Sequence, residues 1–212
     1  MKLRLILGDQ LNIQHPWFKT VDATVCYILM EMRQETDYAP HHIQKVVAFF
    51  GAMRNFAHAL ESKGHRVSYI TLDDPNNKQD LNENLSLLIE QMGVTSFEYQ
   101  LPDEYRLDEQ LKDFCQRTTV ETQAVDTQHF MTKREDLTEF FEGKKQLILE
   151  FFYRNMRKQF NLLMQQGQPE GGQWNYDKNN RKKWKGTPSI PLAYIPKTEE
   201  LEALQKELKL LG

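Results

Sequence analysis

The 212-residue sequence predicts an α/β protein: a doubly wound, mainly parallel five-stranded sheet with flanking helices, followed by a helical and irregular extension. Short apolar segments alternate with amphipathic helical segments through the first part of the chain, which is the pattern of a Rossmann-like fold. The segment at residues 24–30, TVCYILM, is nearly continuously apolar. Parallel strands that are covered by helices on both faces have this composition.

Five segments are expected to form the strands: residues 3–7, 24–30, 66–71, 95–100 and 120–125. The clearest helix follows the second strand, where apolar residues recur at steps of three and four: Val46, Phe49, Phe50, Met53, Phe56, Ala57 and Leu60. Gly64 stands where a helix C-cap is expected, just before the third strand. Residues 81–92 and 107–116 repeat this arrangement with a weaker apolar face.

The pattern changes after residue 127, and we divide the chain into an α/β domain at 1–166, an irregular linker at 167–197 and a helix at 198–212. Residues 147–166 are predicted to form one helix, and the linker carries too many glycines and prolines for a packed element. The last helix has one leucine stripe, formed by Leu201, Leu204, Leu208 and Leu211. We expect this stripe to lack a partner in this chain and the helix to begin a missing helical domain.

Composition excludes several classes of protein. The formal net charge of −3 gives no general attraction to nucleic acid. Cys26 and Cys115 cannot supply the four thiolates of a usual iron–sulfur cluster, and two cysteines favour a reducing compartment. The N-terminus does not have the pattern of a signal peptide, and no apolar segment is long enough to span a membrane. We therefore expect a cytoplasmic protein without membrane contact.

Polar residues follow the first two predicted strands at their carboxyl ends, where ligands of doubly wound sheets bind. Gly8, Asp9 and Gln10 come directly after the first strand, and Glu31 and Glu35 follow the second. A glycine allows close approach of a ligand, and the polar side chains offer donors and acceptors to a heterocycle. A polar turn and an exposed loop are the alternatives, and the residues alone do not decide between them.

Other chemistry-bearing residues do not form a recognisable catalytic set. His41 and His42 lack the spacing of a zinc site, and no nucleophile motif, dinucleotide fingerprint or P-loop is present. Basic and aromatic residues gather in EFFYRNMRKQF, with Arg154, Arg157 and Lys158, and again at residues 181–185. Phosphate contact and a solvated surface are equally compatible with these clusters.

Five motifs occur in this order between residues 2 and 181: ILGDQL, DYAPHHIQKVVAFFGAMRNFAHAL, LPDEYRLDEQL, EFFYRNMRKQFNLLM and QPEGGQWNYDKNNR. Together they resemble the amino-terminal antenna domain of the deoxyribodipyrimidine photolyase-related proteins, which include iron–sulfur bacterial cryptochromes and prokaryotic (6-4) photolyases. The resemblance implies an antenna pigment, 6,7-dimethyl-8-ribityllumazine, in the α/β domain. The residues that it assigns to the pigment are Gly8, Asp9, Gln10, Met30, Glu31, Glu35 and Phe50.

The resemblance also implies what this chain does not carry. FAD and a [4Fe–4S] cluster belong to a carboxyl-terminal domain that is absent here, so the expected partner is that domain or an equivalent subunit. Damaged DNA would be bound only by the whole protein, and we expect no repair by this chain alone. The alternatives are an independent Rossmann-like protein or enzyme for a nucleotide or pterin-like compound, and a structural interaction domain with an empty pocket.

Overall fold

The computed structural model describes residues 1–181, 183, 185–193 and 198–211. The chain divides into two compact units, of which the first comprises Met1–His129 with Pro196–Gly212 and the second Phe130–Ile195. Within the irregular segment expected at 167–197, residues 182, 184 and 194–197 lie outside the described residues, and so does residue 212 at the end of the last helix. No helix in the described part of the chain is long and apolar enough to cross a membrane.

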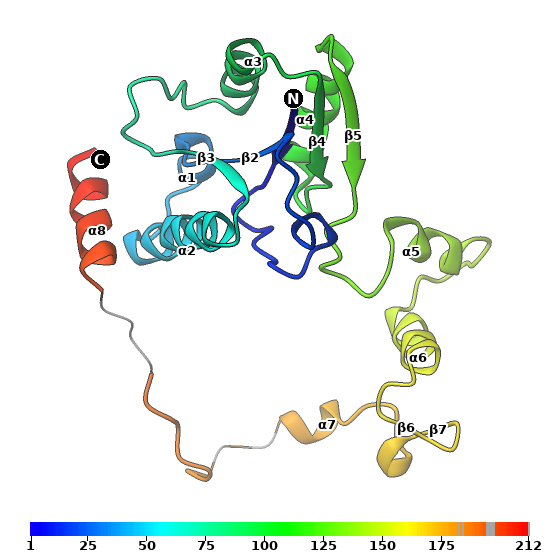
Figure 1. Ribbon diagram of the computed structural model, residues 1–212. Coiled ribbons are helices and arrows are strands. Elements are labelled where there is room, and N and C mark those ends of the chain that lie inside the picture. Colours follow the sequence, from blue (N-terminus) through cyan, green and yellow to red (C-terminus); the bar gives the residue numbers. More distant parts are fainter. Residues whose placement is uncertain (182, 184, 194–197, 212) are drawn as a thin grey trace. The chain divides into compact units, whose positions relative to one another are not determined.

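The first unit contains the predicted parallel sheet (Figure 1). Its strands are β1 (Lys2–Leu5), β2 (Val25–Met30), β3 (Arg66–Ile70), β4 (Ser96–Gln100) and β5 (Glu121–Val125). They lie in the order β3-β2-β1-β4-β5, and every neighbouring pair is parallel. The register places Leu3 opposite Cys26 on one side and Phe97 on the other. The predicted doubly wound α/β fold is therefore confirmed.

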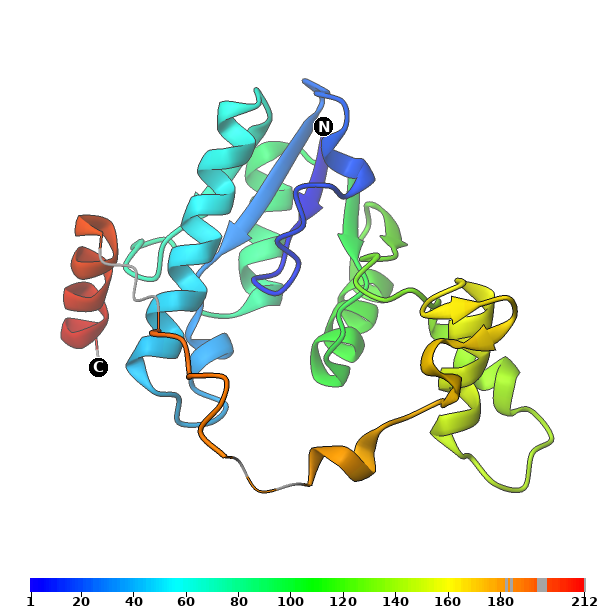
Figure 2. The ribbon, with the colours of Figure 1, turned by 90° about the horizontal axis from the view of Figure 1, so that it is seen from below.

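Helices cover both faces of the sheet (Figures 1 and 2). The elements between the strands are the 3-10 helix η1 (Pro16–Phe18), α1 (Arg33–Thr36), α2 (Ile43–Ser62), α3 (Leu81–Met92) and α4 (Tyr105–Arg117). Local chemistry sets their ends: the Asp80 carboxylate accepts from the Glu83 N–H at 2.9 Å at the start of α3. Gly93 ends the same helix with φ 59°, a left-handed conformation that glycine adopts without strain.

Alternating side chains of the strands form a core on each face. Leu3 and Ile28 face α3 and α4, whereas Tyr27 and Leu29 face α2. All six residues of β2 are buried, as the continuous apolar run in this segment predicts for a strand covered on both sides. Burial of large apolar side chains on both faces stabilises the sheet by about 1.5–3 kcal/mol for each fully buried side chain.

The last helix, α8 (Glu199–Leu211), packs on α2 within the first unit. Leu204 and Leu208 are buried in the same core as Phe50, so the expectation that the leucine stripe lacks a partner in this chain was wrong. Close packing depends on Gly51, where a Cβ atom would lie 2.6 Å from Leu201 Cδ2. The sequence pattern of α8 shows an apolar face but cannot show which surface covers it.

The second unit has little regular structure. It comprises α5 (Arg134–Phe141), α6 (Leu149–Gln159), the short strands β6 (Met164–Gln165) and β7 (Gln168–Pro169), η2 (Glu170–Gly172) and α7 (Asp177–Asn180). The single helix predicted over 147–166 was too long, because Asn161 and Leu163 have positive φ angles of 52° and 50° and an antiparallel β6–β7 pair follows.

Two of the basic residues singled out in α6 have partners within the second unit. Arg157 is buried and donates to the carbonyl oxygens of Leu162 at 3.1 Å and Trp174 at 3.2 Å. Arg154 donates to the Glu150 carboxylate at 2.9 Å. Arg157 therefore ties α6 to the segments that follow it, whereas Arg154 is paired within α6 itself. Lys182 and Trp184 of the second basic cluster lie outside the described residues.

Candidate functional site

A cleft of about 230 Å³ opens at the carboxyl ends of the strands. The chain winds from β1 through β2 to β3 in one direction and continues with β4 and β5 on the other side of β1. The connections that leave β1 and β4 therefore run in opposite directions, and a crevice forms where they part. Residues after three strands line it: Asp9 after β1, Gln34 and Glu35 after β2, and Glu104 and Arg106 after β4.

Asp9 and Glu35 bring two acidic groups to this cleft. Burial raises the pKa of the Glu35 carboxyl above its ordinary value, and the negative charges of Asp9 and Glu104 raise it further. Burial is also the largest cause of the raised pKa of Asp9, with the charge of Asp103 adding to it. Within the described part of the chain, no hydrogen bond or ion pair engages the Glu35 carboxylate. Its oxygens are available to a ligand with N–H or O–H donors.

Aromatic and cationic groups form the rim of the cleft. The Arg106 guanidinium lies 4.4 Å from the centre of the Tyr38 ring, and its Nε donates to Glu104 Oε1 at 2.7 Å. Tyr38 and His41 make an edge-to-face contact with ring centres 5.0 Å apart. Lys45 Nζ donates to His41 Nδ1 at 3.2 Å. The site therefore combines carboxyl acceptors with flat surfaces on which a ring can stack.

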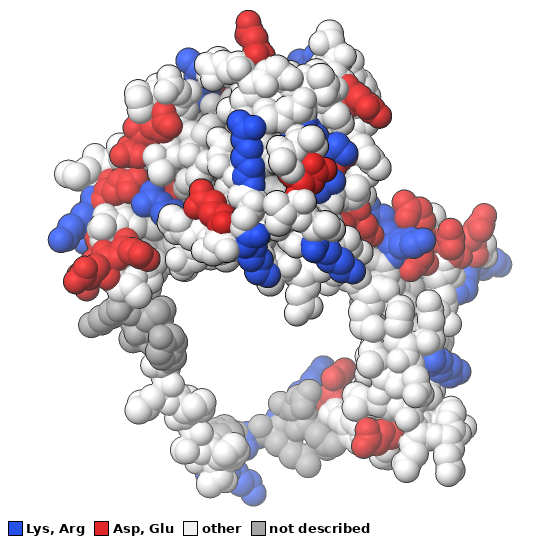
Figure 3. Space-filling model, in the orientation of Figure 1, with Lys and Arg blue, Asp and Glu red and all other residues white. Residues whose placement is uncertain are grey.

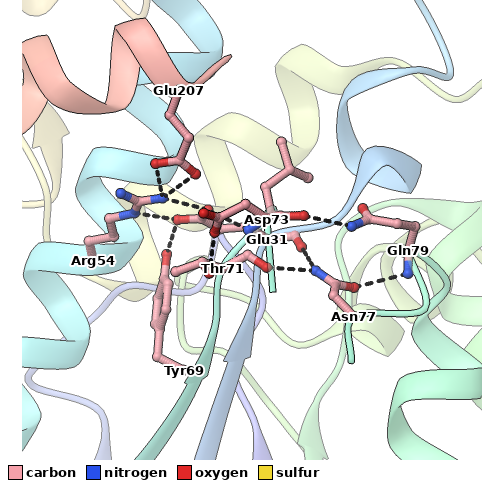
Figure 4. Close-up of polar contacts among 9 residues, drawn as sticks. Glu31, Arg54, Tyr69, Thr71, Asp73, Asn77, Gln79 and Glu207 are labelled. Carbon is pink, nitrogen blue, oxygen red and sulfur yellow. Dashed lines mark hydrogen bonds and ion pairs between the residues drawn. The ribbon is translucent and has the colours of Figure 1, made fainter. Parts of the chain in front are cut away.

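Glu31 lies near the same sheet edge but has a different role (Figure 4). Its side chain is fully buried and accepts from Arg54 Nε at 2.6 Å, from Arg54 Nη2 at 2.8 Å and from the Tyr69 hydroxyl at 2.7 Å. The Leu72 N–H donates to the same carboxylate at 3.0 Å. Burial and the charge of Glu31 raise the pKa of Tyr69. Both oxygens of Glu31 are therefore used within the protein.

Three other residues that the resemblance assigned to the pigment also point into the protein. Gln10 accepts from the Leu7 N–H at 3.0 Å and donates to the Gln100 carbonyl at 3.1 Å, which closes the turn after β1. Met30 and Phe50 are buried in the two cores. Phe49, the neighbour of Phe50, lines the cleft instead.

Gly8 lies beneath the cleft, against Phe49. The structure thus brings Gly8, Asp9 and Glu35 together from the predicted set of site residues. Sequence reasoning missed the rim residues Glu104 and Arg106. Their segment, LPDEYRLDEQL, directly follows the strand predicted at 95–100, so its position along the chain already placed it at the same edge.

The sequence matches the family described as deoxyribodipyrimidine photo-lyase-related protein over residues 4–209. The chain belongs to this family. The predicted resemblance is confirmed.

Two curated proteins illustrate the relationship. The (6-4) photolyase of Agrobacterium fabrum (strain C58 / ATCC 33970) is 32% identical over 181 residues, which are 85% of this chain and 36% of that protein. The uncharacterized protein R852 of Acanthamoeba polyphaga mimivirus is 24% identical over 172 residues, 76% of this chain and 83% of that protein. This photolyase-related protein thus spans about a third of the length of the Agrobacterium photolyase and most of the length of the viral protein.

The described residues of this photolyase-related protein include no group of three or more His, Cys, Asp or Glu side chains arranged to hold a metal ion. Cys26 is buried in β2 and Cys115 lies on α4, and both thiols are free. The cleft offers binding groups, namely carboxylates, aromatic rings and cations. The geometry of these groups suits the binding of a planar, hydrogen-bonding molecule.

Proposed function

We propose that this photolyase-related protein is an antenna unit, which holds a light-absorbing pigment for a photolyase- or cryptochrome-like repair or photoreceptor system. The pigment proposed is 6,7-dimethyl-8-ribityllumazine. Its site is the cleft between the connections that leave β1 and β4. The observation that carries this proposal is the pair of acidic groups, Asp9 and Glu35, facing an open cleft with an aromatic wall. Carboxylates can accept from the imide N–H of the lumazine and from the ribityl hydroxyl groups.

The redox chemistry is assigned in this proposal to another polypeptide segment or subunit. FAD and a [4Fe–4S] cluster would belong to a carboxyl-terminal domain or an equivalent partner, because a cluster needs more thiolates than Cys26 and Cys115 supply. Damaged DNA would be bound by the assembly, and this chain alone would not repair it. In support, the formal net charge of the chain is −3, and both acidic and basic side chains lie on the face of the first unit that Figure 3 shows. The two free cysteines favour a cytoplasmic location.

A titration of the purified chain with ribityllumazine, followed by absorption and fluorescence, tests the proposed function. We expect a shifted pigment spectrum that saturates, and weaker binding in Asp9→Asn and Glu35→Gln. Glu90→Gln is the matched control, because Glu90 is an exposed carboxylate of α3 away from the cleft. An unchanged pigment spectrum at high protein concentration would contradict the antenna assignment.

The second candidate is an independent binding protein or enzyme for a nucleotide or pterin-like compound. One observation favours it: the matched residues cover 83% of the viral protein R852, so this relative consists mostly of the region that it shares with this chain. The same titration with a pterin and with a mononucleotide separates the two candidates. Saturable binding of either compound without binding of ribityllumazine supports the second candidate.

A further inference from the structure

Phe49 of α2 separates two chambers at the carboxyl end of the sheet. The outer chamber is the cleft of about 230 Å³ that contains Asp9 and Glu35. The inner chamber is a void of about 10 Å³ at the ends of β1 and β2. Phe49 and Glu35 are the two residues that line both chambers. The inner void has room for one water molecule at most, so it holds no ligand while the ring is in place.

Gly8 explains how the ring reaches this position. A Cβ atom at Gly8 would lie 2.3 Å from Phe49 Cζ and 2.8 Å from Met53 Sδ. The end of the Phe49 ring therefore rests on the bare backbone at the end of β1, where a planar ligand could otherwise stack. Phe50, whose ring centre is 5.9 Å from that of Phe49, is fully buried in the core. Phe49 is only partly buried and packs at the edge of that core, where it also lines the cleft.

We propose that Phe49 determines the specificity of the cleft by controlling whether a planar ring can enter the inner chamber. This inference rests on the proposed function, because it concerns the ligand of the same site. With the ring in the described position, a ligand is confined to the outer chamber and stacks on Phe49. When the ring is displaced or removed, the two chambers join into one slot.

The walls of the joined slot suit a heteroaromatic ring system with a polar edge. Met30, Met32 and Met53 line the inner chamber, and thioether side chains adapt to the shape of a ring and make favourable contacts with it. Glu35 stands at the boundary and can accept from a ring N–H. The native Phe49 thus keeps the ring of a ligand in the outer chamber, and a smaller residue would admit a fused bicyclic ring to the inner chamber as well.

The first test uses benzene as a probe that is independent of any pigment. In Phe49→Ala, benzene should shift the NMR signals of the Met30 and Met53 methyl groups, because an apolar cavity of this kind binds such a probe. The wild type should show no shift. Val46→Ala is the matched control, since Val46 is an α2 residue that lines the outer chamber but not the inner one. If Phe49→Ala does not fold, the same benzene test is made with Phe49→Leu.

Equal shifts in the wild type and in Phe49→Ala, or none in either, would overturn the proposal. So would a shift of the same size in Val46→Ala.

The second test measures ribityllumazine affinity by fluorescence. Phe49→Ala should bind the pigment about tenfold more tightly than the wild type, the scale expected when a steric block is removed from an apolar pocket. Adding Gly8→Ala to Phe49→Ala should remove this gain, because the new Cβ projects into the slot. Equal affinities of wild type and Phe49→Ala would overturn the specificity role.

The two tests also distinguish the failure of this proposal from the failure of the proposed function. Benzene could enter Phe49→Ala while neither the wild type nor this variant binds ribityllumazine. In that case the proposed control of ring entry by Phe49 stands and the antenna assignment fails. If the wild type binds ribityllumazine but benzene shifts no methionine signal in Phe49→Ala, the antenna assignment stands and the proposed control of ring entry by Phe49 fails.

Discussion

Glu31 and Glu35 lie four residues apart at the end of β2, and the surroundings of their carboxylates differ. Glu31 directly follows β2 and is fully buried, with four hydrogen bonds from Arg54, Tyr69 and Leu72. Glu35 follows four residues later and faces the cleft, and among the described residues its carboxylate has no hydrogen-bond or ion-pair partner. A carboxylate at the end of a parallel strand is thus available to a ligand only when the protein leaves its oxygens unpaired.

The largest effect is expected from Glu31→Ala. This substitution leaves Arg54 and Tyr69 without the acceptor that holds them, so we expect the free energy of unfolding to fall by about 3 kcal/mol. Equilibrium unfolding in urea measures this loss. Glu31→Gln keeps the shape of the side chain and should therefore lose less stability than Glu31→Ala. If Glu31→Ala lowered the free energy of unfolding no more than Glu90→Ala, a substitution of an exposed glutamate, the distinction between Glu31 and Glu35 would fail.

Glu35→Ala should show the opposite behaviour. We expect ribityllumazine to bind about tenfold more weakly, the scale of a lost hydrogen bond to a charged group. The free energy of unfolding should change by no more than about 0.5 kcal/mol, because no packed partner is lost. The two measurements are a fluorescence titration and urea unfolding of the same preparation. Unchanged affinity together with clear destabilisation would make Glu35 a structural residue like Glu31.

The pH dependence of stability sharpens the contrast. The pKa values of Asp9 and Glu35 are raised, so the native state holds these protons more tightly than the unfolded chain does. Their protonation therefore stabilises the fold, and this contribution is lost as pH rises from the ordinary carboxyl range through the raised values. Glu35→Gln should gain stability relative to the wild type on going from about pH 4 to pH 7. A difference that is constant across this range would contradict the raised pKa of Glu35.

Glu207→Gln should have the smallest effect. Arg54 Nη2 also lies 3.2 Å from the Glu207 carboxylate of α8, but this ion pair is partly exposed to solvent. Such pairs contribute about 0–1 kcal/mol, so urea unfolding should show a loss of about 0.5 kcal/mol. The leucine contacts of α8 with α2 remain in this variant. A loss as large as that of Glu31→Ala would show that Arg54 depends equally on both carboxylates.

The sequence by itself determined the fold class and the edge where the site lies. Apolar segments of strand length alternate with helical periodicity, and parallel strands joined by helices have their carboxyl ends at one edge. This reasoning placed Gly8, Asp9 and Glu35 at that edge. It placed Glu31 there as well, because local sequence does not distinguish a strand-end carboxylate that is paired from one that is free.

Only the tertiary structure decided which of these residues face the cleft. The partners of Glu31 are 23 and 38 residues away in Arg54 and Tyr69, so they become neighbours only when α2 and β3 pack beside β2. The same packing turns Phe50 into the core and Phe49 toward the cleft, and it provides α2 as the surface that covers the leucines of α8. Helical periodicity shows which residues share a face, but the surface that each face meets depends on long-range contacts that no local pattern encodes.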